Sequence, residues 1–225
     1  MKLLVLRPEP GASETAARAQ AMGLAPVVAP LFAIRPLAAR PVDPADYDSV
    51  LLTSANGARH APEGLGDLPC FAVGESTAAA ARRRGFADVR TGPSDGAAAA
   101  ALAAAAGFQR ILHPCGRDHL PVAAPGVAIE RLAVYSAEPL PPARFEGPAV
   151  AMIHSARAGR RFGEVVADRS AIAIAAIAEA AADSAGDGWA AKAVAAEPRD
   201  HALLELAAKL CNYGLGEAKE GGDGL

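Results

Sequence analysis

Short apolar segments alternate with alanine-rich helical segments along most of the chain, and this alternation constrains the fold more than any other feature. Several apolar segments, such as Leu3–Leu6 and Ile172–Ile174, would be apolar on both faces of a strand. Strands of this kind are typical of parallel sheets that helices cover on both sides. We expect strands near residues 2–7, 26–32, 49–54, 70–74, 88–91, 110–114, 128–135, 149–154, 171–177 and 191–196.

The ends of four helices are marked by residues that favour helix termini. We expect a first helix from Ser13 to Gly23, and others near 75–85, 94–107 and 200–211. Ser, Thr or Asp at a helix start accepts hydrogen bonds from free N–H groups, and Gly at the end tolerates positive φ. The regular alternation of strand and helix therefore predicts an α/β fold with doubly wound parallel sheets.

Three kinds of strand-and-turn segment occur twice in the same order, which favours two similar lobes. Residues 51–59 resemble residues 152–160, because each segment is a strand, then Ser-Ala, then a short polar turn with Gly and Arg. Residues 71–78 resemble 175–182, and 4–8 resemble 111–114 more weakly. Chance similarity among alanine-rich strand–helix units is the alternative explanation.

Two proline-rich stretches, at 35–44 and 138–142, predict the places where the chain crosses between the lobes. Two crossings make one lobe discontinuous. The predicted boundaries are residues 1–33 plus 139–225 for lobe 1 and 37–134 for lobe 2, with linkers near 33–37 and 134–139. The Gly-rich, charged tail at 214–225 is expected to be disordered.

Composition and missing motifs exclude several classes of function. The formal net charge of −3 gives no basic field for nucleic acid, and no apolar segment has the length and side-chain size of a membrane span. The three cysteines lack CxxC spacing, so we expect no disulfide framework or zinc site, and a cytoplasmic location. The sequence has no nucleotide-binding loop, metalloprotease motif or hydrolase elbow. We interpret His113 and His154 as hydrogen-bonded residues at strand ends, and expect no metal and no cofactor.

Ligands of doubly wound folds bind at the carboxyl ends of the strands, so the residues there are the candidate site. Helix starts at these ends suit carboxylates or phosphates, because free N–H groups and the helix dipole point at the ligand. Capping of a helix by Ser76 or Thr77 alone is the alternative. The candidate residues are Arg7, Ser54, Ala55, Asn56, Gly74, Ser76, Thr77, Gly116, Arg117, Tyr135, Ser155, Ala156, Ala178 and Glu179.

Tyr135 closes a predicted strand just before the second proline-rich stretch. Its phenol can donate a hydrogen bond to a leaving oxygen. The alternative is a hinge residue with a packed ring and a solvated hydroxyl. Sequence position alone leaves both interpretations open.

An ordered set of segments covering nearly the whole chain resembles the uroporphyrinogen-III synthase family. The segments are 4–8, 52–57, 73–78, 112–116, 134–135, 154–156 and 195–198. The resemblance implies two α/β lobes joined by a two-stranded linker, a monomer, and no cofactor. It implies cyclisation of the linear tetrapyrrole hydroxymethylbilane to uroporphyrinogen III, with loss of water and inversion of ring D, in haem biosynthesis.

The resemblance also implies roles for individual residues. Tyr135 would donate to the leaving hydroxyl group, while Thr77, Ser54 and Ser155 would hold substrate carboxylates. The chain departs from the family pattern at 177–182, which reads Ile-Ala-Glu-Ala-Ala-Ala where threonines are common. We therefore expect that loop to contribute its N–H groups rather than side-chain hydroxyls.

Two other functions share these fold-level features. A non-catalytic two-lobed module could bind an anionic small molecule through the same helix starts. A duplicated receiver-like signalling domain would need paired acidic residues after the first strand, where Glu9 stands alone.

Overall fold

The computed structural model describes residues 1–92, 95–119, 121–141, 143–145 and 147–213. The tail predicted to be disordered, 214–225, lies outside the described residues, as does Ser94 at the predicted start of the third helix. The chain divides into two compact units. Unit 1 comprises Met1–Ala33 and Pro139–Leu225, and unit 2 comprises Ile34–Glu138.

Unit 1 contains a five-stranded parallel sheet in the order β11-β10-β9-β1-β2. The order reverses between β1 and β9, which makes the junction of these two strands the topological switch point of the unit. The strands are β1 (Lys2–Val5), β2 (Ala25–Val28), β9 (Ala149–Ile153), β10 (Ile172–Ala176) and β11 (Ala191–Val194). The helices are α1 (Gly11–Ala21), α5 (Ala156–Val165), α6 (Glu179–Ser184) and α7 (Asp200–Tyr213).

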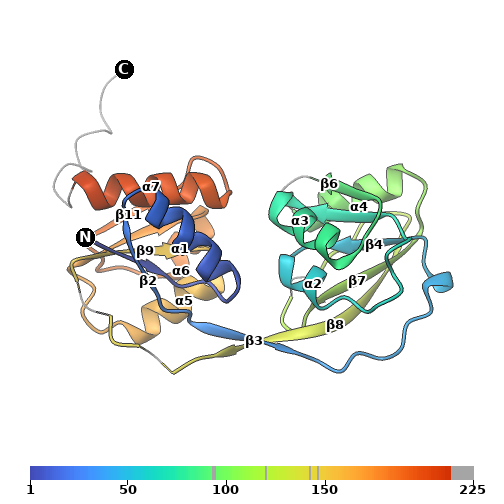
Figure 1. Cartoon of the computed structure of the whole chain (residues 1–225), viewed down its shortest axis with the longest axis horizontal. Coiled ribbons are helices and arrows are strands. Elements are labelled where there is room, and N and C mark those ends of the chain that lie inside the picture. Colours follow the sequence, from blue (N-terminus) through green and yellow to red (C-terminus); the bar gives the residue numbers. More distant parts are fainter. Residues whose placement is uncertain (93–94, 120, 142, 146, 214–225) are drawn as a thin grey trace, which may run out of the picture. The chain divides into compact units, whose positions relative to one another are not determined.

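The sheet of unit 1 is buried on both faces, as its uniformly apolar strands predict. Every residue of β9 and β10 is buried. Helices α1 and α7 contact each other and share one hydrophobic core with the strands (Figure 1). On α5, a Cβ at Gly159 would lie 2.5 Å from the carbonyl oxygen of Ala181, so α5 and α6 pack with almost no space between them.

Unit 2 contains a six-stranded sheet in the order β3-β8-β7-β4-β5-β6, and its order reverses between β4 and β7. The pairs β4/β5, β4/β7, β5/β6 and β7/β8 are parallel. The strands are β3 (Phe32–Pro36), β4 (Ser49–Leu52), β5 (Cys70–Val73), β6 (Val89–Gly92), β7 (Arg110–Gly116) and β8 (Ala128–Pro139). The helices are α2 (Ala55–Arg59), α3 (Gly74–Arg84) and α4 (Gly96–Ala105), and a 3₁₀ turn, η1, spans Pro44–Asp46.

The predicted α/β class with parallel sheets is confirmed, but several local expectations are wrong. Helix α1 begins at Gly11, and Ser13 does not cap it: the backbone N–H and hydroxyl of Ser13 donate to the Glu9 carboxylate at 3.0 and 2.8 Å. The segments expected to be polar turns after Ser54 and Ser155 are the helices α2 and α5. The apolar pattern did not predict strand β3, because its Pro36 is typical of a link; an edge strand accommodates proline. It pairs with β8 where the family resemblance implied a two-stranded linker. Within the described part of the chain, no helix has the length and apolar character to cross a bilayer.

Candidate active site

The carboxyl ends of β4 and β7 meet where the strand order of unit 2 reverses. Ser54 follows β4, Gly116 ends β7, and Tyr135 is the partner of Gly116 on β8. The hydroxyl oxygens of Ser54 and Tyr135 lie 3.2 Å apart, and either can donate. The structure therefore brings three of the sequence-predicted residues together at the position where ligands of open α/β sheets bind.

The ring of Tyr135 is held in place by the glycine beneath it. A Cβ on Gly116 would lie 2.9 Å from Cζ of Tyr135 and 3.1 Å from its hydroxyl oxygen, so only glycine leaves room for the ring. The backbone N–H of Arg117 donates to the carbonyl oxygen of Tyr135 at 2.8 Å, while the Arg117 side chain is exposed. Gly116 thus positions Tyr135 by leaving room for its ring, and Arg117 does so through its backbone hydrogen bond.

Helix α2 starts directly against the end of β7. The Ser54 hydroxyl accepts a hydrogen bond from the Gly57 N–H at 2.9 Å and so caps the helix. A Cβ on Gly57 would lie 2.6 Å from the carbonyl oxygen of Pro114, which fixes this close approach. Ala55 and Asn56 occupy the first turn, where backbone N–H groups have no partner within the helix.

Helix α3 begins at Gly74, immediately after β5. Gly74 has φ of +73°, a conformation that favours glycine. Val73 is the N-cap, and no side chain caps the helix, so capping by Ser76 or Thr77 is wrong. Thr77 is buried and Ser76 is exposed. The start of α3 keeps the N–H groups that a carboxylate would bind.

In unit 1, the remaining candidates follow β1, β9 and β10. Ser155 caps α5, because its hydroxyl accepts a hydrogen bond from the Ala158 N–H at 3.2 Å, and Ala156 is the first helical residue. Ala178 precedes α6 and offers no side-chain cap. Glu179 is exposed in the first turn of α6.

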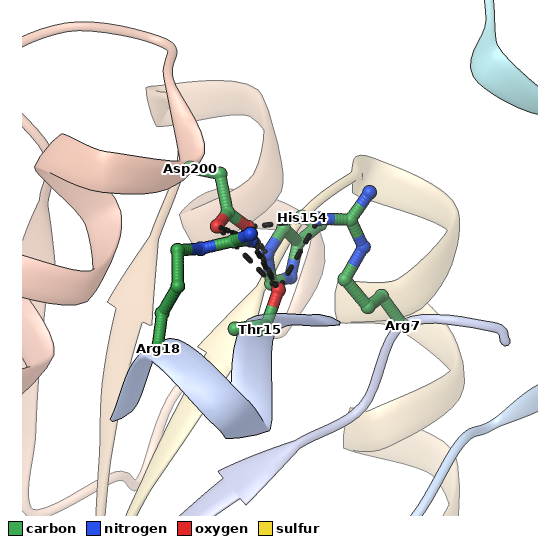
Figure 2. Close-up of polar contacts among 5 residues, drawn as sticks. All are labelled: Arg7, Thr15, Arg18, His154 and Asp200. Carbon is green, nitrogen blue, oxygen red and sulfur yellow. Dashed lines mark hydrogen bonds and ion pairs between the residues drawn. The ribbon is translucent and has the colours of Figure 1, made fainter. Parts of the chain in front are cut away.

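Arg7 belongs to a polar cluster at the switch point of unit 1, which Figure 2 shows. Its guanidinium donates to Asp200 at 2.8 Å, and Arg18 donates to the other oxygen of the same carboxylate at 2.5 Å. The Nε2 atom of His154 lies 2.8 Å from Oδ1 of Asp200, and the Thr15 hydroxyl donates to the same oxygen at 3.2 Å. We call these five residues the Asp200 cluster. It joins the ends of β1 and β9 to helices α1 and α7.

The pKa values in the Asp200 cluster favour a carboxylate beside a neutral imidazole. Burial would raise the pKa of Asp200, but the hydrogen bond from His154 and the positive charges of Arg7 and Arg18 hold it well below its usual range. Burial, together with the positive charge of Arg7, lowers the pKa of His154 more than its hydrogen bonds and the charge of Asp200 raise it. Neutral His154 therefore donates its Nε2–H to ionised Asp200 at neutral pH.

Sequence reasoning missed Asp200, Thr15 and Arg18 as members of this site. Asp200 was expected only as a helix start, and Thr15 lies inside α1. One sequence signal could have indicated such a partner. Arg7 follows a predicted strand, and Glu9 is the only acidic residue close to it in the sequence.

Each of the two units contains parallel strands and has polar groups at its switch point. These features are typical of doubly wound α/β proteins, which bind ligands at the strand ends. The chain belongs to the uroporphyrinogen-III synthase family, because the family model described as "Uroporphyrinogen-III synthase HemD" matches residues 13–205. This match confirms the predicted family, whose members are cyclising lyases of tetrapyrrole biosynthesis.

Solved structures support the same fold. A uroporphyrinogen-III synthetase from Helicobacter pylori 26695 superposes with a TM-score of 0.62 at 15% identity, covering 93% of this chain and 98% of that one. A mutant uroporphyrinogen III synthase from the extremely thermophilic bacterium Thermus thermophilus gives a TM-score of 0.51 at 16% identity, covering 94% of this chain and 100% of that one. The comparison with curated proteins found no match.

Proposed function

We propose that this chain cyclises hydroxymethylbilane to uroporphyrinogen III, inverting ring D and releasing the ring A hydroxyl group as water. The observation that carries the proposal is the pair formed by Ser54 and Tyr135, 3.2 Å apart at the switch point of unit 2 in a chain of this family. Closure at the substituted carbon of ring D forms one carbon–carbon bond and eliminates water. Inversion then breaks the bond between that carbon and the bridge from ring C and re-forms it at the free carbon of ring D, which loses its proton. The sequence needs a proton donor and positioning but no oxidant.

Tyr135 is the proposed donor to the leaving hydroxyl group. Its ring rests on Gly116, and its hydroxyl meets Ser54, so the donor is oriented by both shape and hydrogen bonding. General acid help of this kind contributes roughly 10²–10⁴-fold to a rate. Holding the reacting carbons of the substrate together contributes further, because the entropy of bringing them together is lost on binding and not during ring closure.

The substrate carries eight carboxylates, whereas the chain has a formal net charge of −3. Binding must therefore use local groups rather than an overall positive field. The proposed groups in unit 2 are the hydroxyls of Ser54 and Thr77, the N–H groups that start α3, and exposed Arg117. In unit 1 they are Ser155 and the N–H groups that start α5.

Arg7 and Glu179 are the charged candidates of unit 1. Asp200 already neutralises Arg7, yet Figure 2 shows the second terminal nitrogen of Arg7 directed away from the cluster. We propose that this nitrogen binds a substrate carboxylate while the first stays with Asp200. Glu179 is exposed, so its charge can turn toward solvent while the N–H groups near Ala178 bind the substrate.

We also propose that the predicted lobes, residues 1–33 plus 139–225 and 37–134, move about the links near 33–37 and 134–139. A monomer in the cytoplasm is the proposed working form. The free thiols of Cys70, Cys115 and Cys211 fit a reducing compartment.

The function is tested by mixing the purified full chain with hydroxymethylbilane and following substrate loss against buffer alone. We expect substrate loss well above the spontaneous rate, and proportional to the amount of protein. Substrate that disappears at or below the spontaneous rate would instead favour the non-catalytic binding module, which protects what it binds.

A further inference from the structure

Three metal-ligating side chains meet at the end of β7, apart from the groups used above. One ring nitrogen of His113, one of His119 and the Sγ atom of Cys115 all lie within 4.8 Å of one another. His113 and Cys115 are two residues apart on β7, so they project from the same face of the strand. His119 follows the turn after β7 and returns to that face. We call these residues the β7 cluster.

Two side chains of the β7 cluster are buried, and the third has a ring nitrogen without a partner. His113 and Cys115 are both 1% exposed. The Nδ1 atom of His119 is buried and has no hydrogen-bond partner among the described residues. A buried polar atom without a partner is costly in free energy, which an ion would relieve.

A second contact fixes the orientation of His113. Its Nε2 atom lies 3.0 Å from the hydroxyl oxygen of Thr53 at the end of β4. Metal-binding histidines usually use the second ring nitrogen in such a bond, which orients the ring.

We propose that His113, Cys115 and His119 form a binding site for Zn²⁺, with a fourth position open to water. Two imidazoles and one thiolate are a ligand set that zinc prefers. Ligand atoms around tetrahedral zinc are roughly 3.3–3.8 Å apart. The cluster is at most 4.8 Å wide, so small side-chain rotations close it around the ion.

Arg131 is the charged group that faces this site. Burial raises the pKa of Cys115, and Arg131 partly offsets this by hydrogen bonding and charge. The positive charge of Arg131 opposes a bound cation. The thiolate supplies the compensating negative charge when Zn²⁺ displaces the Cys115 proton.

The probe is Co²⁺, which occupies tetrahedral zinc sites and absorbs light there. The full chain is first stripped with a chelator and then titrated with CoCl₂. We expect visible bands of a four-coordinate ion and a near-ultraviolet band of thiolate-bound cobalt, saturating at one equivalent and abolished by one equivalent of ZnCl₂.

Three variants make the result specific. Cys115→Ser should lose the near-ultraviolet band, and His119→Gln should weaken binding by more than the roughly 10–100-fold that outer-shell changes cost. Cys211→Ser, in α7 of unit 1, should bind as the wild type does. His119 lies in a half-buried loop, so its variant tests the site even if Cys115→Ser fails to fold. Binding that does not saturate at one equivalent, or that is equal in the wild type and His119→Gln, would overturn the proposal. The readout is independent of cyclisation, so neither result depends on the proposed function.

Discussion

Replacing Asp200 with alanine should destabilise unit 1 by about 3 kcal/mol. Arg7 and His154, with side chains 24% and 11% exposed, each donate to the carboxylate at 2.8 Å. Hydrogen bonds that involve a charged group contribute roughly 1.5–3 kcal/mol each. Arg18 is 47% exposed, so solvent screening limits its share to less than about 1 kcal/mol. Because Asp200 is itself 21% exposed, we expect the lower end of the roughly 3–5 kcal/mol that breaking a buried pair costs.

The chain offers a built-in probe for this measurement. Trp189 is the only tryptophan, and its ring stacks on Phe162 of α5 with centroids 5.1 Å apart. Tryptophan fluorescence during urea unfolding therefore reports on unit 1. With a urea dependence of about 1–3 kcal/mol per molar, a loss of about 3 kcal/mol lowers the midpoint by roughly 1–3 M.

Glu197→Ala is the matched control, because Glu197 pairs with Arg199 in the same unit but both side chains are largely exposed. Its midpoint should change little, since exposed pairs contribute less than about 1 kcal/mol. If Asp200→Ala shifts the midpoint no more than Glu197→Ala does, the reasoning about the Asp200 cluster is refuted.

The remaining predictions concern catalysis, capping and pH. Tyr135→Phe should slow formation of the type III isomer by roughly 10²–10⁴-fold without unfolding the chain, and turnover at the wild-type rate in a direct assay would remove the acid role. Ser54→Ala and Ser155→Ala should each lower the free energy of unfolding by about 1 kcal/mol, because each hydroxyl caps a helix; unchanged thermal melting would contradict this. Stability of unit 1 should fall as pH drops from about 7 toward 4, because the lowered pKa of His154 means that only the unfolded state takes up its proton below about 6.5. Asp200, whose pKa is also lowered, adds a further loss below about 3.9. A His154→Gln variant with the same slope between pH 7 and 4 in urea titrations would be inconsistent with that assignment.

The buried strands were predictable because their residues leave no polar face. Every residue of β10 is apolar, and a strand of that kind has to be covered on both sides. Helix α5 was not predictable in the same way, because Gly159 and Gly163 are poor helix formers. Close packing explains why glycines stand in this helix. A Cβ at Gly163 would lie 2.6 Å from the carbonyl oxygen of Ala185, and this close approach exists only in the folded chain.

Only part of the candidate site was predictable, namely the part that follows from the rule that ligands bind at the carboxyl ends of parallel strands. Ser54 follows β4, and the strand that contains Tyr135 was expected to end at this residue, so the rule places the two at the same edge of a sheet. That strand end is wrong, because β8 continues to Pro139; Tyr135 reaches Ser54 because it lies opposite Gly116 at the end of β7. The pairing of Arg7 with Asp200, 193 residues away, depends on how α7 packs beside β1 and β9. The β7 cluster similarly depends on the turn that returns His119, which the spacing of residues does not specify.

The isomer composition of the product tests the central claim most directly. Hydroxymethylbilane closes by itself to the non-inverted type I isomer, so the type III isomer forms only if the substrate is held for attack by the crowded carbon of ring D. With excess wild-type chain, chromatography of the oxidised product should show type III in large excess. Type I as the main product at every protein concentration would contradict the account.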